Sequence, residues 1–442
     1  MTKITFYKGL RVIGGTFVSV ETDRAVCMFD FGFTVSDRAD ESIRLRPDHI
    51  PQDYVRAGML PAADGIYEPQ AAADLGLVPY GETEKPHFFL ISHMHIDHMG
   101  GLDMLDPRIP VYMTEESETL YRRLAAQSDL TFREHPSCIG VPDGQSFSVE
   151  DITVQVLLID HDCVGACGFL IRTPDGTICY TGDYRFHGYH PDRTAAFGEA
   201  CRGADVLITE GVTVSFGDVD MLSLTAPDPH DRTEADLLEE TVTFCAEAPG
   251  LVVINPYNRN VERIHNLTER LARQNRRLVL DAVQADYLAA FYPQDPMCVY
   301  AETVCGHAVP ERAVLIGRDE LLRRPGAYVL QLDYRDFYEL FDLKPVVSGY
   351  LHMDGAPLGA YDPSYGKMLL QLEAMGIPFR SMGLGGHARP YYLKQMVDLI
   401  APKVLVPLHS QRPEQVASRC AGRRILPEEG QTLILEKGEV KA

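Results

Sequence analysis

The chain has 442 residues, of which 45% are hydrophobic and 24% charged, and its formal net charge is −22 at pH 7. This length exceeds what one ordinary hydrophobic core supports, so we expect two domains in a protein of typical soluble globular composition. No apolar run of about 18 residues occurs, which excludes a membrane-spanning helix. The acidic balance excludes a protein that coats nucleic acid non-specifically, although an enzyme acting on nucleic acid needs only a local positive field.

The N-terminus lacks the apolar region of a secretion signal, and ten cysteines are scattered without a disulfide framework. Reduced thiols are typical of a cytoplasmic protein, which is therefore the expected localisation. Short strands are predicted at 4–7, 16–20 and 25–30, with turn signals between them. Residues 34–86 are rich in Pro, Asp and Gly, and we expect an irregular segment that covers a functional site.

A strand, a loop and a helix are predicted around residues 88–106, followed by a short strand at 109–113. Thr114 is a good N-cap for a helix over 115–126, because its hydroxyl can accept a hydrogen bond from the first turn. The next predicted strands are 147–158, 167–173, 177–181 and 206–209, and the Thr-Pro-Asp-Gly turn at 173–176 predicts a hairpin.

From residue 232 the pattern changes to an alternation of helices and strands, which predicts a parallel sheet with helices on its faces. The predicted elements are a helix at 233–246, a strand at 251–255, a helix at 261–274 and a strand at 278–281. A strand at 378–382, a helix at 390–400 and a strand at 403–407 predict one more βαβ unit.

Four metal-ligand side chains lie within six residues, directly after an apolar run: His93, His95, Asp97 and His98. Imidazole and carboxylate are ligands of Zn²⁺, Mn²⁺ and Fe²⁺. The period of two in extended chain places the first two histidines on one side, and the last two residues then turn towards a second position. One segment can therefore supply half of a two-metal site.

Three further candidates follow predicted strands, namely His161, Asp183 and His409. Taken alone, each histidine is more simply interpreted as an edge residue and the aspartate as a turn former. With the 93–98 cluster present, they complete the coordination of two ions about 3.5–4 Å apart. The sequence does not choose between Zn²⁺ and Mn²⁺, since His/Asp sites accept both.

Together these motifs resemble the metallo-β-lactamase fold, in which Asp30, the 93–98 motif, His161, Asp183 and His409 occur in this order. The chain is similar in particular to the β-CASP branch of RNA- and DNA-processing nucleases that includes ribonuclease J. Three stretches carry this closer resemblance: Val206–Glu210 resembles motif A, Gly385-Gly386-His387-Ala388 resembles motif B, and Leu405–His409 resembles motif C.

The resemblance implies an αββα sandwich formed by residues 1–208 and 383–442, with a parallel-sheet β-CASP-like domain inserted at 209–382. It implies two divalent ions, most simply Zn²⁺: His93, His95 and His161 would hold one, Asp97, His98 and His409 the other, and Asp183 would bridge them. Asp30 would lie behind the site and orient ligands. A bridging hydroxide would attack phosphorus, His387 would contact the scissile phosphate or protonate the leaving oxygen, and Glu210 would position His387 or a ligand.

Two departures concern the positions that contact phosphate in the family. Gly383 and Gly385 replace a histidine and a serine of ribonuclease J motif B, and motif A reads Glu-Gly-Val-Thr. Backbone N–H groups of Gly385 and Gly386 could still contact a phosphate. Helical spacing places Arg259, Arg263, Arg270 and Arg273 near one another, so they could form an electropositive rim for nucleic acid, or else a solvated helix face with Glu262 and Glu269 as partners.

The expected function is metal-dependent hydrolysis of phosphodiester bonds, with single-stranded RNA as the expected substrate and endonuclease or exonuclease action left open. One alternative is a hydrolase of the same fold that acts on a small phosphoester, thioester or lactone, which the acidic charge and the altered motif B favour. A second is a non-catalytic nucleic-acid-binding subunit, which the intact ligand set argues against. No membrane partner is expected, and a homo-oligomer is compatible with the sequence.

Overall fold

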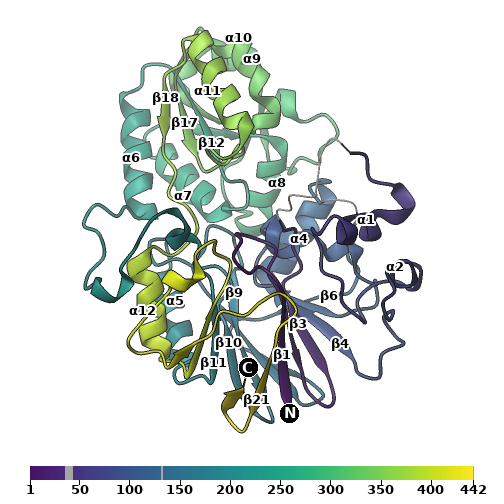
Figure 1. The fold of residues 1–442 in the computed structure, drawn as a ribbon. Helices are drawn as coiled ribbons and strands as arrows, with labels where there is room; N and C mark the ends of the chain where they lie inside the picture. Colours follow the sequence, from purple (N-terminus) through teal and green to yellow (C-terminus); the bar gives the residue numbers. More distant parts are fainter. Residues whose placement is uncertain (35–42, 131–132, 442) are drawn as a thin grey trace. The chain divides into compact units, whose positions relative to one another are not determined.

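The computed structural model describes residues 1–34, 43–130 and 133–441, and the chain divides into two compact units (Figure 1). Unit 1 comprises Met1–Asp231 and Gly386–Ala442, and unit 2 comprises Arg232–Gly385. The sequence places these boundaries at 208/209 and 382/383. In the structure the first boundary lies at 231/232 instead, because the segment after residue 209 packs on unit 1, with Val214 and Met221 buried in its core.

Unit 1 contains two sheets. In the first, the strands from β3 to β6 run parallel and the others pair antiparallel. Its spatial order is β22 (Glu439–Lys441), β21 (Thr432–Glu436), β1 (Thr2–Lys8), β2 (Phe17–Glu21), β3 (Val26–Phe29), β4 (His87–Leu90), β5 (Val111–Thr114) and β6 (Cys138–Val141). The first and last segments of the chain are therefore neighbours in this sheet.

The second sheet of unit 1 joins an antiparallel meander to three parallel strands and a short edge strand. Its order is β20 (Arg423–Arg424), β19 (Val404–Pro407), β11 (Val206–Thr209), β10 (Gly176–Tyr180), β9 (Cys167–Thr173), β8 (Ile152–Leu158) and β7 (Ser146–Val149). The hairpin predicted at 173–176 is confirmed as the β9–β10 turn. The single strand predicted at 147–158 is wrong, because the chain turns at Glu150, whose φ is +53°, and forms the β7–β8 hairpin.

The two sheets pack face to face, and their inward side chains form one hydrophobic core that includes Phe6, Val20, Val154, Phe169 and Val406. Helices cover the outer faces (Figure 1). The α-helices of unit 1 are α1 (Ile50–Arg56), α2 (Pro69–Leu75), α3 (Ile96–Met99), α4 (Glu115–Ala126), α5 (Pro191–Ala200) and α12 (Pro390–Ile400). Its 3₁₀ turns are η1 (Pro47–His49), η2 (Leu102–Met104), η3 (Val212–Phe216), η4 (Met221–Ser223) and η8 (Pro413–Gln415).

The helices of unit 1 follow local signals in the sequence. Helix α4 begins where predicted, since the side chain of Thr114 accepts a hydrogen bond from the backbone N–H of Ser117. Helix α12 covers the predicted residues 390–400, and α5 and α12 pack with the second sheet in a common apolar cluster. The expectation of an irregular segment at 34–86 holds only in part: α1 and α2 lie within it, and residues 35–42 are outside the described residues.

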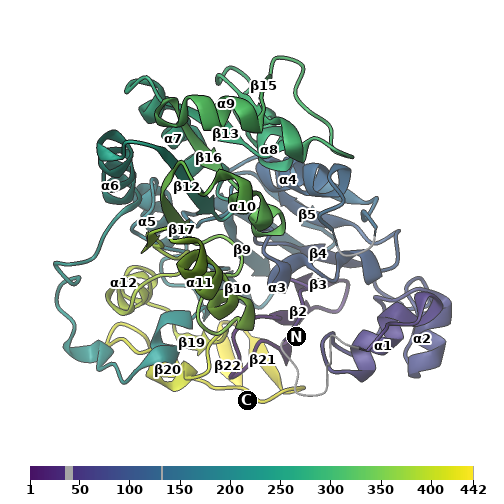
Figure 2. The ribbon, with the colours of Figure 1, turned by 90° about the horizontal axis from the view of Figure 1, so that it is seen from above.

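Unit 2 is a parallel sheet with helices on both faces (Figure 2). Its strand order is β15 (Val314–Ile316), β14 (Cys298–Tyr300), β13 (Arg277–Leu280), β16 (Tyr328–Gln331), β12 (Leu251–Pro256), β17 (Val347–Met353) and β18 (Phe379–Ser381). Its α-helices are α6 (Glu234–Glu247), α7 (Val261–Ala272), α8 (Ala282–Phe291), α9 (Arg318–Arg323), α10 (Leu340–Leu343) and α11 (Pro363–Met375). Its 3₁₀ turns are η5 (Ala301–Thr303), η6 (Pro325–Ala327) and η7 (Tyr334–Glu339). The predicted helix–strand alternation after residue 232 is confirmed.

The βαβ unit predicted for residues 378–407 is wrong. Strand β18 pairs with β17 in the sheet of unit 2, whereas β19 pairs with β11 in unit 1. The sequence shows two strands and a helix, but it does not show that the chain returns to another sheet between them. Among the described residues, no helix combines the length and the apolar character that crossing a membrane requires.

Candidate metal centre

The candidate ligands of unit 1 lie just beyond the carboxyl ends of its central strands. His93 follows β4, His161 follows β8, Asp183 follows β10 and His409 follows β19, whereas Asp97 and His98 lie on the short helix α3. Parallel strands end at the same edge of a sheet, so residues far apart in the sequence meet there. Short segments on rigid strands hold such side chains firmly, as a metal site requires.

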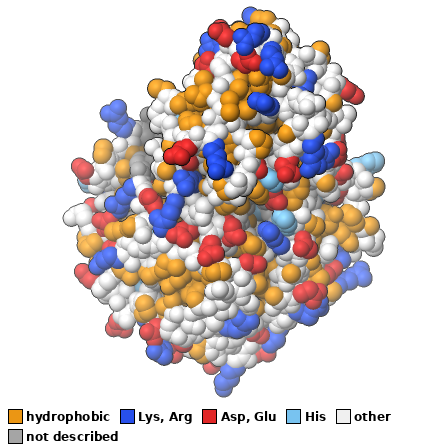
Figure 3. Space-filling model, turned by 180° about the vertical axis from the view of Figure 1, so that it is seen from behind, with side chains coloured by type: hydrophobic (Ala, Val, Ile, Leu, Met, Phe, Trp, Pro, Cys, Tyr) orange, Lys and Arg blue, Asp and Glu red, His pale blue; other side chains and the backbone are white. Residues whose placement is uncertain are grey.

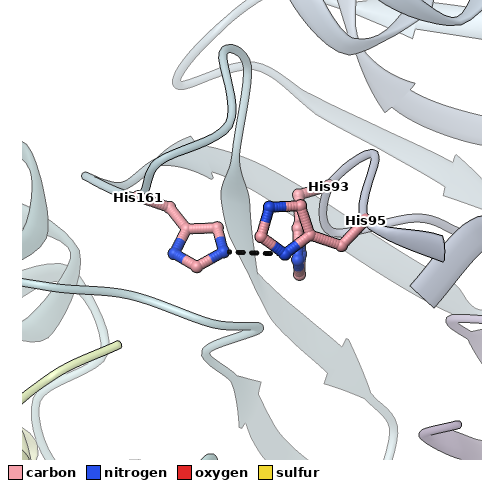
Figure 4. A group of neighbouring side chains, drawn as sticks. All are labelled: His93, His95 and His161. Carbon is pink, nitrogen blue, oxygen red and sulfur yellow. Dashed lines mark hydrogen bonds between the residues drawn. The ribbon is translucent and has the colours of Figure 1, made fainter. Parts of the chain in front are cut away.

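A first cluster contains the three histidines predicted to share one ion: His93, His95 and His161 offer ligand atoms that all lie within 4.8 Å of one another. The rings of His95 and His161 face each other, and Nδ1 of the first lies 3.4 Å from Nε2 of the second (Figure 4). Two nitrogens bound tetrahedrally to Zn²⁺ at 2.0–2.1 Å are separated by about 3.3–3.4 Å. The spacing of this pair therefore fits one ion.

A second cluster brings together Asp97, His98 and His409, whose ligand atoms also lie within 4.8 Å of one another. Asp183 belongs to two further groups of this kind, one with His93 and His98 and one with His387 and His409. The Oδ2 atom of Asp183 lies 3.1 Å from Nε2 of His98, 3.4 Å from Nε2 of His409 and 3.8 Å from Nε2 of His93. One carboxylate thus faces histidines of both predicted ligand sets, as a bridging residue would.

Buried polar atoms without a partner support this interpretation. The Nε2 atoms of His93, His98 and His409 and both carboxylate oxygens of Asp183 have no hydrogen-bond partner among the described residues. Such atoms cost free energy unless something satisfies them. Because they converge on the same small volume and are nitrogen and oxygen donors, divalent cations fit there, and the donor set suits both Zn²⁺ and Mn²⁺.

Charge in the cluster favours cations. Burial lowers the pKa of His161 to about 3 and lowers that of His93 well below its usual value, so both imidazoles are neutral, as metal ligands must be. Burial alone would also lower the pKa of His98, but the carboxylates of Asp183, Asp97 and Asp30 raise it well above its usual value. These carboxylates attract positive charge to the place where a divalent ion would replace a proton.

Residues behind the ligands fix the orientation of the rings. Asp30 is fully buried at a φ of +57°, and its Oδ2 lies 2.7 Å from Nδ1 of His98. The same carboxylate accepts hydrogen bonds from the backbone N–H and the hydroxyl of Ser92 and from the hydroxyl of Tyr180. This network lies behind the candidate ligands, and the role of Asp30 in orienting them stays a prediction.

His387 and Glu210 form a pair beside Asp183. Nδ1 of His387 lies 3.3 Å from Oε2 of Glu210 and 3.6 Å from Oδ2 of Asp183. Glu210 is 1% exposed and also accepts hydrogen bonds from the backbone N–H groups of Tyr184 and Ala388. Burial alone would lower the pKa of His387, but Glu210 and Asp183 raise it, to about 10. The pair is therefore built to hold a proton on the histidine.

Glycines let the backbone approach the cluster. A Cβ atom at Gly32 would lie 1.8 Å from the carbonyl carbon of Asp97, so only glycine allows this packing against the ligand segment. The carbonyl oxygen of Gly386 lies 2.7 Å from Nδ1 of His161 and can accept its proton. Gly386 thus supports a ligand histidine, while its contact with substrate stays a prediction. In unit 2, the N–H of Gly385 is directed at Oδ2 of Asp354, 3.4 Å away.

Arg259 and Arg263 cannot take part in the predicted electropositive rim. Their side chains are buried in unit 2, and Arg263 is 1% exposed. Two of its nitrogens pair with the carboxylate of Glu234 at 2.8 and 3.0 Å, and a third donates to the carbonyl of Met353. On the face drawn in Figure 3, Lys and Arg side chains are interspersed with acidic ones. The two arginines therefore do not serve as an accessible contact for nucleic acid.

The structure adds one residue that the sequence did not single out. Asp162 is 7% exposed and follows the ligand His161 directly in the chain. Its Oδ1 lies 3.2 Å from Nε2 of His95 and 3.3 Å from Nε2 of His161. In the sequence its only signal was an acidic side chain next to a candidate ligand, which is too common to carry a prediction.

Comparisons with known proteins agree with this geometry. Residues 67–247 match a family model described as the beta-lactamase superfamily domain. Ribonuclease J of Thermus thermophilus is 22% identical over 380 residues, which cover 80% of this chain and 63% of the relative. Ribonuclease J of Mycoplasma genitalium is 21% identical over 437 residues, which cover 93% and 68%. The chain thus spans about two thirds of the length of these relatives.

Among solved structures, a protein of unknown function from Enterococcus faecalis V583 is similar over 98% of this chain and 99% of its own, with a TM-score of 0.81 and 31% sequence identity. The fold class predicted from the sequence is therefore confirmed. The domain match and the curated relatives agree on a protein of metallo-β-lactamase fold that is similar to ribonuclease J, and the full-length structural match, whose function is unknown, adds support for the fold alone.

Proposed function

We propose that this chain is a metal-dependent ribonuclease that hydrolyses phosphodiester bonds of single-stranded RNA. The observation that carries the proposal is the convergence of the predicted ligand side chains into buried clusters whose donor atoms lie within 4.8 Å of one another. The names of the ribonuclease J relatives support RNA as the substrate class. Because the chain spans only about two thirds of the length of those relatives, carrying over the activity of the whole relative is part of the proposal.

In this proposal His93, His95 and His161 would hold one divalent ion, Asp97, His98 and His409 would hold the other, and Asp183 would be shared by the two ligand sets. Zn²⁺ is the ion we favour, with Mn²⁺ as the alternative, because imidazole and carboxylate donors suit both. Two divalent ions, when bound, supply the activation of water and the neutralisation of phosphate charge that phosphodiester hydrolysis needs.

The chain's own residues supply the proton transfer. His387 carries a proton because Glu210 lies 3.3 Å from its Nδ1, and we assign its Nε2 atom to the leaving oxygen. Glu210 acts as a positioning residue: it holds the ring through Nδ1 and the adjacent backbone through the N–H of Ala388, 3.2 Å away. The proton of His387 is therefore held in a fixed position on one side of the site, by a ring whose orientation Glu210 fixes.

The test is cleavage of 5′-monophosphorylated single-stranded RNA by metal-stripped full-length protein to which Zn²⁺ or Mn²⁺ is returned. Asp97→Ala removes one ligand and should abolish cleavage, whereas Asp192→Asn, an equal change of charge on the exposed face of α5, should leave it intact. The ladder of products separates endonuclease from exonuclease action.

Other outcomes identify the two alternatives. Two bound ions per chain without RNA cleavage, together with turnover of a small phosphoester, thioester or lactone, would indicate a small-molecule hydrolase. Protection of single-stranded RNA without bound metal or turnover would indicate a binding subunit. Either result would contradict the proposed ribonuclease.

A further inference from the structure

Most of the ligand histidines share one arrangement of their two ring nitrogens. In each, Nε2 faces the cluster while Nδ1 contacts an oxygen of the protein. The four Nδ1 contacts are with Ser92 Oγ at 3.0 Å for His93, Asp30 Oδ2 at 2.7 Å for His98, Gly386 O at 2.7 Å for His161, and Thr16 Oγ1 at 3.3 Å for His409. Nδ1 of His409 also accepts a hydrogen bond from the N–H of Gly14. In the other three, such outer contacts fix the proton on Nδ1 and make Nε2 a better metal ligand.

His95 is turned the other way. Its Nδ1 faces the cluster, 3.4 Å from Nε2 of His161 (Figure 4), so the nitrogen that needs an outer partner is Nε2. That nitrogen lies 3.2 Å from Oδ1 of Asp162, which is within hydrogen-bonding distance. Relative to the His95 ring, the Asp162 carboxylate therefore occupies the same outer position that an oxygen atom occupies beside each of the other four histidines.

The chain confines Asp162 to this position. Its side chain is buried, and Oδ1 makes no hydrogen bond of standard geometry to the described residues, with Nε2 of His95 3.2 Å away. A Cβ atom at Gly386 would lie 2.3 Å from this oxygen, so the glycine backbone closes the space on that side. Desolvation makes an unpaired buried carboxylate costly, and a proton donated by His95 offsets that cost.

Asp162 is not among the residues whose donor atoms converge, although its Oδ1 lies 3.3 Å from the inner nitrogen of His161. The groups of donor atoms that converge within 4.8 Å, among the residues that the structure describes, contain His95 and His161 but not Asp162. A carboxylate oxygen on the outer nitrogen of a ring cannot share an ion with the inner nitrogen of the same ring. Asp162 thus contacts the outer side of the His95 ring.

We propose that Asp162 is a positioning residue that holds the proton of His95 on Nε2 and thereby presents Nδ1 to the ion of the three-histidine cluster. This proposal rests on the proposed metal-dependent function, but it concerns how tightly one ion is held. The carboxylate also places a negative charge 3.3 Å from Nε2 of His161, which strengthens the attraction of a cation to this cluster.

The experiment measures metal affinity rather than turnover. Full-length protein is stripped of metal and titrated with Co²⁺ alone, in competition with a chromophoric chelator, for the wild type, Asp162→Ala, Asp162→Asn and the exposed charge control Asp192→Asn. Asp162→Ala should weaken one of two Co²⁺ equivalents by about tenfold to a hundredfold. Asp162→Asn should lose less, because its amide oxygen can still accept from Nε2, and the control should match the wild type.

Each other outcome has a distinct meaning. Two Co²⁺ affinities in both Asp162 variants that equal those of the wild type would overturn the positioning role. Altered Co²⁺ absorption bands at saturation would overturn it as well, because they would make the carboxylate a ligand. If Asp162→Ala fails to fold, Asp162→Asn alone decides by the same criteria. A wild-type chain that binds no Co²⁺ would instead contradict the proposed metal site, before Asp162 is considered.

Discussion

The Oδ2 atom of Asp30 lies 2.7 Å from Nδ1 of His98, and both side chains are fully buried. Three more donors, from Ser92 and Tyr180, point at the same carboxylate. This short network ties the end of β3 to the ligand segment after β4 and to β10. It makes the stability of the fold and the orientation of a ligand depend on one side chain.

Replacing Asp30 by Asn should therefore weaken both properties. The amide nitrogen of the new asparagine would face the donor groups of Ser92 and Tyr180, with which it cannot form hydrogen bonds. Because the lost hydrogen bonds had a charged acceptor, the free energy of unfolding should fall by about 3 kcal/mol. Denaturant unfolding of metal-free protein measures this, and Zn²⁺ competition measures the loss of affinity at the cluster containing His98. Asp23→Asn, at an exposed carboxylate, is the control. Equal stability and affinity in the Asp30 variant would contradict the interpretation.

His387→Ala should reduce the turnover number for RNA by about 10²–10⁴-fold, the usual contribution of a general acid, and should leave the metal content unchanged. The structure places this ring against Glu210 rather than within either predicted ligand set. Metal analysis beside steady-state kinetics tests both parts. Loss of a bound ion in the variant would make His387 a ligand, since it can also group with Asp183 and His409.

Arg263→Ala should destabilise unit 2 by about 3–5 kcal/mol, because it leaves the buried carboxylate of Glu234 without its partner. Affinity for RNA, measured at a temperature where the variant is folded, should not change. Arg270→Ala is the matched control on the same helix: its partner Glu239 is exposed, so the unfolding free energy should stay almost the same. A stable Arg263 variant with weakened RNA binding would restore the arginine to a substrate-contacting role.

Unit 2 should become less stable as pH rises through the titration of Asp281. Burial raises the pKa of this carboxyl to about 6, although Gln284 and Gln331 donate hydrogen bonds to it. Below pH 3.8, the ordinary pKa of an aspartate carboxyl, this group is protonated in both the folded and the unfolded chain, and between pH 3.8 and 6 it ionises only in the unfolded chain. Stability attributable to this group therefore falls across that window, by about 3 kcal/mol in total.

Unfolding free energies at several pH values between these limits, for the wild type and Asp281→Asn, isolate this effect. The difference between the two should shift steadily in favour of the variant as pH rises, whatever constant cost the lost hydrogen bond adds. Asp319→Asn, on the exposed face of α9, controls for net charge. A difference that does not change with pH would show that Asp281 titrates alike in both states.

Local patterns in the sequence predicted much of what the structure shows. The cap at Thr114, the helix Pro390–Ile400 and the strand Val206–Thr209 depend on neighbouring residues, and each lies where it was expected. The candidate ligand set could be predicted because four of its members lie in one short segment and the rest follow strands. Such features need no knowledge of how distant segments pack.

The predictions that were wrong concern features that depend on tertiary packing. Helical spacing places Arg263 near other arginines, but only tertiary structure shows that its face is buried against Glu234. The pairing of β18 with β17 and of β19 with β11 depends on where the chain crosses between units. Asp162 gains its role from a contact with His95, and sequence spacing does not reveal on which side of that ring it lies.

The position of His409 has a consequence for the timing of synthesis. It stands at the end of β19, which pairs with β11, and β11 ends at Thr209 while β19 begins only at Val404. A nascent chain lacks this histidine until the segment 404–409 has been synthesised, long after β11. If the finished protein cuts RNA, a copy whose synthesis has not yet passed His409 cannot assemble the second ligand set and therefore stays inactive.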